Sequence, residues 1–433
     1  MLNTVLLVSL ALQAQADTVS LGIRQAMIAA RKDAFQAESA RSKSKELEAK
    51  AGQSRSALLP HVGVSAYDMV RSFDLPAMGL SFPATGGAPA FPNLIKPYNS
   101  QDARINGRLA LFDAPAWQEY RAARLDMDKG KWDLAAAEEA VATAAADAYL
   151  SLARARALLD SRRAELALAA QLAELTRAQK QAGSATQIEV LRADGQVSTA
   201  KSALAAAEGG EEQARYVLLR ILGMPQDAYP VLTDTLALKD LKDIVPEQPR
   251  DASAPRPEIA AAEMDKRSAQ ASQEALKTSY FPSLELAGDY GLSGRRLNSR
   301  AEWTETIALQ LNWNLWDGGN RESRLHALSE RVRQADLRSR DAKAASEEET
   351  RVSRSAMNAS KEVAGFALER VRFADQEEAL ARERFKSGGS GNLEVISAQA
   401  SVSQAHQAYI DALYAYNRAL LGFLKASNRI SEL

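Results

Sequence analysis

Two kinds of hydrophobic spacing recur along the chain, and each kind appears in both halves. In long stretches the apolar residues stand three and four positions apart, which is typical of amphipathic helices in coiled coils. In shorter runs apolar and polar residues alternate, which is typical of strands with two unlike faces. The helical spacing predicts long helices at 115–182, 187–223, 320–387 and 392–427, and further helices from about Ser20 to Leu58 and at 258–278.

The two halves share a stretch that is repeated at a fixed offset. Residues 183–218 align without a gap with residues 388–423, 205 positions further on. The apolar residues of the two copies coincide in a heptad seam, which indicates an internal duplication. The seam is Val190, Ala193, Val197, Ala200, Leu204 and Ala207 in the first copy, and Val395, Ala398, Val402, Ala405, Tyr409 and Ala412 in the second. A glycine-rich break precedes each seam, at 183–186 and 388–391, so each copy is predicted to be a helical hairpin whose tip is the break.

Alternating runs predict four strands, at about 61–71, 102–113, 283–292 and 303–316. Each run has about ten residues, which fits a tilted strand that crosses a bilayer with lipid on one face and water on the other. One such strand alone would be better interpreted as part of a half-buried soluble hairpin. Four of them, with Trp303, Trp313 and Trp316 near strand ends, favour a membrane barrel.

The alternation also predicts which side chains share a face. We expect the apolar set to face lipid: Ile105, Leu109, Ile307, Leu309 and Leu311. The polar set should face the lumen of the barrel: Arg104, Arg108, Gln310 and Asn312. Four strands cannot close a barrel, and eight would make a pore filled by its own side chains, so an open conduit needs at least three chains.

Proline placement divides the chain, because proline interrupts helix interiors and central strands. Residues 17–223 form the first repeat, 224–257 a proline-rich linker and 258–433 the second repeat. Residues 1–16 are interpreted as a signal peptide, since the apolar run from Val5 to Leu12 is followed by a small-x-small pattern ending at Ala16. The start of a short buried helix is the alternative, because no Lys or Arg precedes the run.

Each pair of predicted strands ends in a turn that carries an aspartate. The sequences are Leu111-Phe112-Asp113-Ala114-Pro115 and Leu315-Trp316-Asp317-Gly318-Gly319. Proline suits the first turn of a helix, and aspartate suits its N-cap. We therefore interpret Asp113 and Asp317 as caps or turn residues rather than catalytic groups.

Charge and residue types exclude several classes of function. The 54 Lys and Arg balance 55 Asp and Glu, so the basic face of a nucleic-acid binder is not expected. The chain contains no cysteine, and its three histidines, His61, His326 and His406, lie far apart in the sequence. No nucleophile–base pair or phosphate-binding loop is recognisable. We therefore expect neither an enzyme nor a cofactor or metal site.

The order and duplication of these features resemble the TolC family of outer-membrane efflux proteins. The resemblance rests on the strand-end sequences quoted above and on the pattern G-x-x-x-x-I/L-E-V at both tips, and it covers essentially the whole mature chain. It implies a homotrimer in which each chain gives four strands to a twelve-stranded barrel in outer-membrane lipid, continued by a periplasmic tunnel of helices. Such proteins are exit ducts of tripartite drug pumps and type I secretion, where they engage a periplasmic adaptor and an inner-membrane transporter.

The same resemblance assigns roles to residues at the tips. Glu394 matches the first carboxylate of a ring that constricts the periplasmic entrance, while the second carboxylate falls on Ser397. The tyrosine and arginine of the family's tip fall on Phe385 and Ser390, so the gate links of the family are not all present. The tips are expected to dock the adaptor's helical hairpin through small and exposed residues, namely Gly183, Ser184, Glu189, Gly388, Gly389 and Ser390.

Two alternatives stay open. Thr186-Gln187-Ile188-Glu189 is a capping-box pattern, so Glu189 and its equivalent Glu394 could simply cap their helices instead of gating a channel. A soluble periplasmic coiled-coil or adaptor protein without a pore is the main alternative function. An adaptor would need a lipoyl-like β domain beside one hairpin, whereas this sequence predicts two hairpins, each with a pair of amphipathic strands.

Overall fold

The chain folds into long helices and two β-sheets. The computed structural model describes residues 18–80, 92–238, 256–297 and 301–430. Its helices are α1 (Ile23–Asp33), α2 (Phe35–Ser56), α3 (Ala114–Gln181), α4 (Gln187–Leu222), α6 (Pro257–Thr278), α7 (Asn320–Lys386) and α8 (Asn392–Ala426), with a short 3-10 helix at Pro76–Met78. Its strands are β1 (Thr18–Leu21), β2 (His61–Asp74), β3 (Leu94–Phe112), β4 (Tyr229–Leu232), β5 (Ser283–Gly294) and β6 (Ala301–Asn312). The prediction of a mainly helical chain with strands is therefore confirmed.

Two compact units make up the chain. The hairpin unit comprises Met1–Lys43, Trp132–Ala260 and Arg340–Leu433. The sheet unit comprises Ser44–Lys131 and Ala261–Ser339. The predicted signal peptide at 1–16 lies outside the described residues, as do residues 239–255 of the predicted linker.

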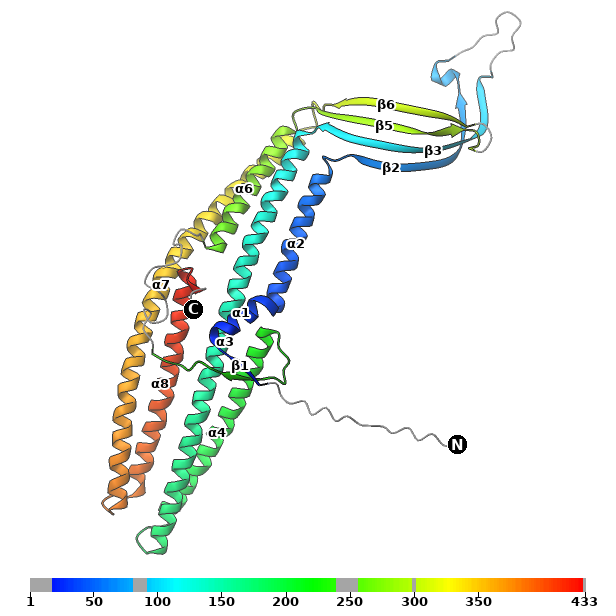
Figure 1. Cartoon of the computed structure of the whole chain (residues 1–433). Helices are drawn as coiled ribbons and strands as arrows, with labels where there is room; N and C mark the ends of the chain where they lie inside the picture. Colours follow the sequence, from blue (N-terminus) through cyan, green and yellow to red (C-terminus); the bar gives the residue numbers. More distant parts are fainter. Residues whose placement is uncertain (1–17, 81–91, 239–255, 298–300, 431–433) are drawn as a thin grey trace, which may run out of the picture. The chain divides into compact units, whose positions relative to one another are not determined.

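In the sheet unit, four antiparallel strands lie side by side in the order β2-β3-β5-β6 (Figure 1). Successive side chains of a strand point to opposite faces, and directly opposed residues share a face. Ile105 lies opposite Val64 and Tyr290, and Leu309 lies opposite Leu286. One face is therefore mainly aliphatic and aromatic, although it includes Glu305. Among the described residues, β2 and β6 are each paired on one side only, so both edges of the sheet are open.

The strands differ most from the predicted ones at the start of β3 and at the end of β6, and a proline bears on each difference. We predicted 102–113 for the second strand, but β3 begins at Leu94, where it pairs with β2 beyond the end of β5. Pro97 lies there at a register shift, which suits a residue that lacks an N–H group. We predicted 303–316 for the fourth strand, but β6 ends at Asn312 because its partner β5 begins just after Pro282.

Side chains bind the backbone groups that the sheet leaves unpaired where its strands end. The Arg321 guanidinium donates to the carbonyl oxygens of Asn314 at 2.7 Å and Ser279 at 3.1 Å. Asp113 Oδ1 accepts from Ala116 N at 2.9 Å, and the Asp317 carboxylate accepts from Arg321 N at 3.1 Å. The interpretation of both aspartates as caps or turn residues is confirmed.

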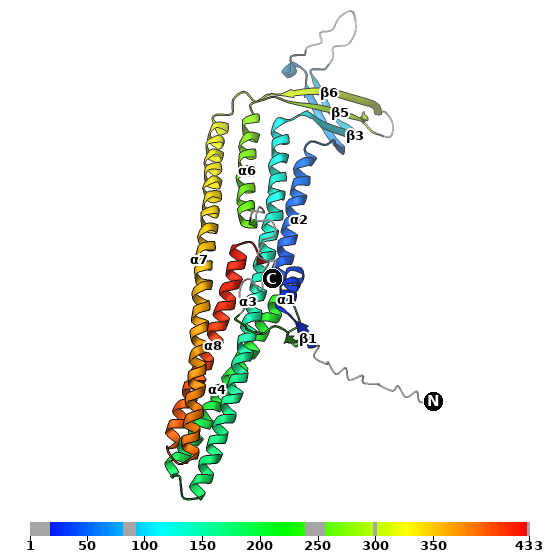
Figure 2. The ribbon, with the colours of Figure 1, turned by 60° about the vertical axis from the view of Figure 1, so that its left-hand side comes forward.

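In the hairpin unit, α3 lies beside α4 and α7 lies beside α8 (Figures 1 and 2). The heptad seams are confirmed, because Val190, Ala193, Ala200 and Ala207 of α4 are buried, and so are their equivalents Val395, Ala398, Ala405 and Ala412 of α8. The four long helices lie within one residue of the predicted bounds. Alanine at so many buried positions lets the helix backbones approach closely.

The helix predicted from about Ser20 to Leu58 is instead a strand and two helices. Residues Thr18–Leu21 form β1, and the chain is extended at Ala34 between α1 and α2, with φ −67° and ψ 136°. β1 pairs in parallel with β4, which forms inside the predicted linker at 224–257. Each of these strands has four residues, too few for alternation to be recognised in a sequence.

Tyr149 of α3 joins this small sheet to the helices. Its side chain is buried, and its hydroxyl lies 3.1 Å from Leu21 O and 2.9 Å from Asp234 N, from which it accepts a hydrogen bond. Burial raises the pKa of the Tyr149 phenol, so the hydroxyl remains protonated and can donate to a carbonyl oxygen.

Removing this hydroxyl should destabilise the hairpin unit. Tyr149→Phe leaves Asp234 N without its acceptor and removes one of the two donors to Leu21 O, which costs about 1 to 3 kcal/mol. The free energy of unfolding from chemical denaturation should fall by that amount. Tyr216→Phe is the control, because the Tyr216 hydroxyl bonds Glu212 at the exposed surface of α4. Equal losses in the two variants would contradict the role given to Tyr149.

Candidate functional site

The two hairpin tips close with the same backbone turn. Gly183 and Gly388 have positive φ angles of 79° and 76°, which glycine adopts without strain. In the first tip Gly183 N donates to Lys180 O at 2.9 Å, and Ser184 N donates to Gln179 O at 2.8 Å. The equivalent bonds of the second tip join Gly388 N to Phe385 O at 3.1 Å and Gly389 N to Arg384 O at 2.8 Å. The duplication therefore extends to individual hydrogen bonds.

At the first tip, Glu189 caps α4. Thr186 N donates to the Glu189 carboxylate at 2.7 Å, and Glu189 N donates to Thr186 Oγ1 at 3.4 Å. The backbone and hydroxyl hydrogen bonds from Thr186 lower the pKa of Glu189 below its ordinary value of 4.5. The capping-box interpretation of Glu189 is confirmed.

At the second tip, the equivalent carboxylate behaves differently. Gly391 stands at the N-cap of α8 and offers no side chain to the helix. The Glu394 carboxylate accepts a hydrogen bond from Arg384 Nη1 at 2.8 Å. Both side chains of this pair are partly exposed, and exposed pairs contribute little stability. The capping interpretation is therefore wrong for Glu394, and its carboxylate lies beside Arg384, one helical turn before the exposed Ser397.

A buried asparagine joins the two tips within one chain. Asn392 Nδ2 of α8 donates to Glu189 O of α4 at 2.8 Å, and the Asn392 side chain is fully buried. Asn392 Oδ1 and Ser390 Oγ are buried atoms without a hydrogen-bond partner in the part of the chain that the structure describes. Sequence analysis missed Asn392. The signal that could have found it is that the equivalent residue of the first copy is Gln187, so the two copies differ at this position.

Phe385 lies at the family's tyrosine position, but it belongs to the core of the hairpin unit. It packs with Leu172 of α3, Ala381 of α7, and Val395 and Ala398 of α8. With the ring buried in this cluster, Phe385 is not available as an exposed gate residue.

On the sheet, register and alternation place Arg104, Arg108, Gln310 and Asn312 on one face. Arg104 pairs with Asp102 and, at 2.6 Å, with Asp289, while Arg108 lies 4.0 Å from Glu285. Sequence analysis missed all three carboxylates; strand pairing brings Asp289 and Glu285 to the arginines from β5, whereas Asp102 lies two residues from Arg104 in β3. The polar face is therefore a row of paired charges.

The opposite face of the sheet is apolar and exposed in the single chain. The exposed fraction is 83% for Ile307, 63% for Leu309 and 54% for Ile105. Large apolar side chains exposed together mark a surface that contacts another apolar phase. Among the described residues, no helix combines the length and the apolar character needed to cross a membrane. Within the same residues, no group of three or more His, Cys, Asp or Glu is arranged to hold a metal ion.

The fold is shared with solved outer-membrane channels. The structure superposes on the CmeC outer membrane channel of Campylobacter jejuni with a TM-score of 0.80, over 94% of this chain and 86% of CmeC, at 16% sequence identity. A family model described as outer membrane efflux protein matches residues 26–224 and 249–429. The chain therefore belongs to the outer membrane efflux protein family.

Two curated proteins are similar in sequence over part of their length. Outer membrane protein OprJ of Pseudomonas aeruginosa is 27% identical over 268 residues, which are 57% of this chain and 53% of OprJ. Pyoverdine export outer membrane protein OpmQ of Pseudomonas putida is 31% identical over 116 residues, which are 26% of this chain and 24% of OpmQ. The chain thus spans about half the length of OprJ and about a quarter of OpmQ.

Family membership confirms the resemblance to TolC-like efflux proteins and the prediction of an outer-membrane location. The family is a class of transport proteins rather than a class of enzymes. The roles predicted for individual residues at the tips and on the sheet remain predictions.

The capping box at the first tip should make the start of α4 sensitive to acid. Because the folded pKa of Glu189 is lowered, its stabilising effect is present above the ordinary value of 4.5 and is lost as pH falls through the lower folded value. Amide-exchange protection at residues 187–190 should therefore decrease between pH 7 and pH 3, and Glu189→Gln should remove that decrease. Glu394→Gln is the matched control, since Glu394 caps no helix. If amide-exchange protection at residues 187–190 still decreased with pH in Glu189→Gln, protonation of Glu189 would not be its cause.

Proposed function

We propose that three copies of the chain form an exit duct that carries small molecules or proteins out of the periplasm across the outer membrane. The observation that carries the proposal is a four-stranded sheet with one exposed apolar face and two open edges. A bilayer interior has no groups to pair with the free N–H and C=O of an edge strand, so a membrane sheet must close. Strands of neighbouring copies would pair β6 with β2 and complete a twelve-stranded barrel.

Three copies are the smallest number that leaves an open lumen. Four strands cannot form a closed barrel, and eight would form one filled by side chains. In the closed barrel Ile105, Leu109, Ile307, Leu309 and Leu311 face lipid, while Arg104, Arg108, Gln310 and Asn312 face the lumen. The exposed aliphatic face also opposes the alternative of a soluble periplasmic coiled-coil protein, which would have to keep that face in water.

The helical part of the duct extends into the periplasm and meets the other components there. In this arrangement residues 1–16 are a cleaved signal peptide, and the repeats at 17–223 and 258–433 are joined by the linker at 224–257. A periplasmic adaptor docks its own helical hairpin on the tips, and an inner-membrane transporter drives export. The exposed Gly183, Ser184, Gly388 and Gly389 support docking at the tips. The cargo we propose is small molecules such as drugs, toxic compounds and metals, or secreted proteins.

The entrance of the duct is constricted by an acidic ring. Threefold symmetry would bring three copies of Glu394 together, with Ser397 one turn further along α8. The Glu394 carboxylate does not cap a helix, and it pairs with Arg384 at the partly exposed tip, where ions can reach it. Rings of carboxylates at a constriction favour cations and bind multivalent ones.

The register of the sheet predicts opposite effects for two neighbouring substitutions. Leu309→Arg puts a charge on the lipid face, which costs about 2 to 4 kcal/mol near the middle of the bilayer. Gln310→Arg, its control, adds the same charge to the lumen face and should cost little. Heat-modifiable oligomer in the outer-membrane fraction should therefore decrease only for Leu309→Arg. Equal assembly of both variants would refute the register, and a stable monomer in native mass measurements of the wild type would refute the trimer.

Glu394→Gln should weaken the block of single-channel current by trivalent cations added on the periplasmic side. It should also lower the cation preference of the channel, because three charges are lost from the constriction. Glu189→Gln, the equivalent change at the first tip, removes a cap and should leave block unchanged. If trivalent cations blocked Glu394→Gln as strongly as the wild type, the acidic ring would have to be formed by other residues.

A further inference from the structure

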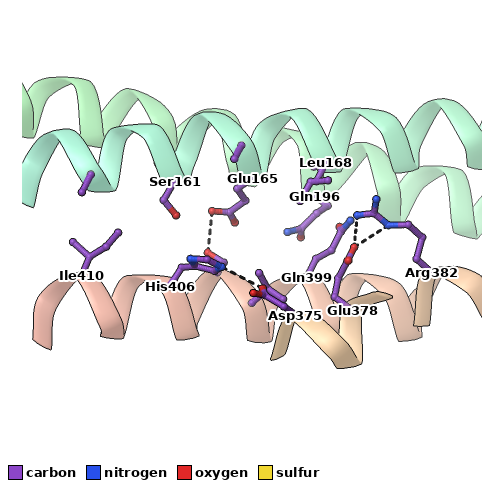
Figure 3. Close-up of a pocket in the computed structure, with 15 residues that line it drawn as sticks. Ser161, Glu165, Leu168, Gln196, Asp375, Glu378, Arg382, Gln399, His406 and Ile410 are labelled. Atoms are coloured by element: carbon purple, nitrogen blue, oxygen red, sulfur yellow. Dashed lines mark hydrogen bonds and ion pairs between the residues drawn. The ribbon is translucent and has the colours of Figure 1, made fainter. Parts of the chain in front are cut away.

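A pocket of about 570 Å³ lies between the two helical hairpins, inside the hairpin unit (Figure 3). It is lined by α3 and α4 on one side and by α7 and α8 on the other. Its volume is within the range of sites that hold small molecules. Neither the barrel nor the tips contribute a residue to it, so the proposed function gives it no role.

Polar side chains span the gap between the hairpins on one side of the pocket. Arg162 of α3 donates to Ser403 Oγ of α8 at 2.6 Å and also pairs with Gln407. Glu165 of α3 accepts from the same Ser403 hydroxyl at 2.9 Å. Further along the two helices, Arg154 pairs with Asp411 at 2.6 Å. Because long side chains bridge the helices here, alanines such as Ala157 and Ala164 leave the space between them unfilled.

The charges that line the pocket leave one carboxylate without a cationic partner. Glu378 pairs with Arg382, and Glu165 pairs with Arg162 at 2.6 Å. Asp375 pairs with no Arg or Lys in the described chain; its half-exposed carboxylate lies 3.2 Å from the ring nitrogen Nε2 of His406, which carries a positive charge only when the imidazole is protonated. The pocket therefore carries a net negative charge that centres on Asp375, which favours a cation over an anion.

An amide side chain without a hydrogen-bond partner in the described chain also lines the pocket. The Gln399 side chain of α8 is only 8% exposed and lies between the two helix pairs (Figure 3). Within the described chain its amide makes no hydrogen bond, nor does the amide of Gln196, which lines the pocket from α4. The Gln399 amide is therefore available to form a hydrogen bond with a polar group that enters the pocket.

The rest of the lining is apolar, with Leu168 from α3 and Val402 and Ile410 from α8. An apolar wall beside a carboxylate and a free amide suits a molecule with an apolar body and one charged group. A bare metal ion does not suit it, since in the described chain no three ligand groups converge.

We propose that this pocket binds a compact organic cation, a protonated amine on an apolar body. Its ammonium group lies between the Asp375 carboxylate and the Gln399 amide oxygen, and its apolar body lies against Leu168 and Val402. The site belongs to a single chain, so binding here requires neither an open pore nor an adaptor.

Three probes that share one apolar body test the chemistry. 1-Aminoadamantane is a cation at neutral pH, 1-adamantanol is neutral and 1-adamantanecarboxylate is an anion. Calorimetric titration of the purified full-length protein in detergent should show one amine bound per chain, with an affinity about tenfold or more above that of the alcohol, since a charged partner strengthens the hydrogen bonds. The carboxylate should not bind. Equal binding of the three probes, or no binding of the amine, would overturn the proposal.

Substitutions test the location. Asp375→Asn should weaken amine binding about tenfold or more, because it removes the charge that attracts the ammonium group. Glu377→Gln is the matched control, since Glu377 is exposed two positions away and does not line the pocket. Ala164→Leu should abolish binding by filling the space, and Gln399→Leu should weaken it. Unchanged binding in Asp375→Asn would overturn the proposal.

Two further readouts separate this site from the duct. The oligomeric state and circular dichroism of each variant show whether the fold is intact. Single-channel conductance should be unchanged in Asp375→Asn and Ala164→Leu, while amine binding is lost. If the wild-type protein conducts ions but binds no amine, only the proposal for the pocket is refuted. If it binds the amine but forms no channel, only the proposal for the duct is refuted.

Discussion

The open edges of the sheet are the constraint on which the rest of the structure depends. β2 and β6 each expose a row of unpaired backbone groups, next to a face whose aliphatic side chains are exposed. In water the edge N–H and C=O groups could bond solvent, but the apolar face would be exposed to water. In lipid the apolar face is favourably placed, but the edge groups have no hydrogen-bond partners. In the proposed duct both demands are met, because copies of the sheet join edge to edge. The alternation along every strand, with paired charges such as Arg104 and Asp289 on the other face, suits a sheet that separates lipid from water.

Duplication gave the chain two similar hairpins but not two equivalent tips. The same glycine turn and the same pair of backbone hydrogen bonds close both of them. Their helix starts differ, since Thr186 caps α4 whereas Gly391 leaves α8 without a side-chain cap. Glu189 is therefore held in a capping box, while Glu394 pairs with Arg384 across its own hairpin. The equivalent carboxylates thus bind backbone at one tip and a side chain at the other, because the residue at the N-cap differs.

Long periodic elements could be predicted from the sequence, whereas features set by distant contacts could not. Helices such as α3 repeat their heptad spacing over many turns, so their bounds were predicted to within one residue. Strand ends depended on the partner strand: Pro97 is tolerated because it lies at a register shift, and Pro282 marks where pairing with β6 stops. Of the site, the Glu189 cap is local and was predicted. Asn392 escaped prediction because its partner, Glu189 O, lies 203 residues away in the chain.

The position of the pocket follows from how the two hairpins contact each other. Apolar clusters join them at two levels, through Leu150 and Leu421 at one and through Leu172 and Val395 at the other. Between these levels the contacts are polar, as in the pairs Arg154–Asp411 and Arg162–Ser403. Alanines pack closely only where the facing residues are small or apolar, and a bridging arginine holds the helices further apart. Ion pairs between two alanine-rich coiled coils are therefore expected to leave a cavity with charged residues in its wall. The proposed preference of this cavity for a cation follows from Asp375, a lining carboxylate that pairs with no arginine or lysine in the described chain.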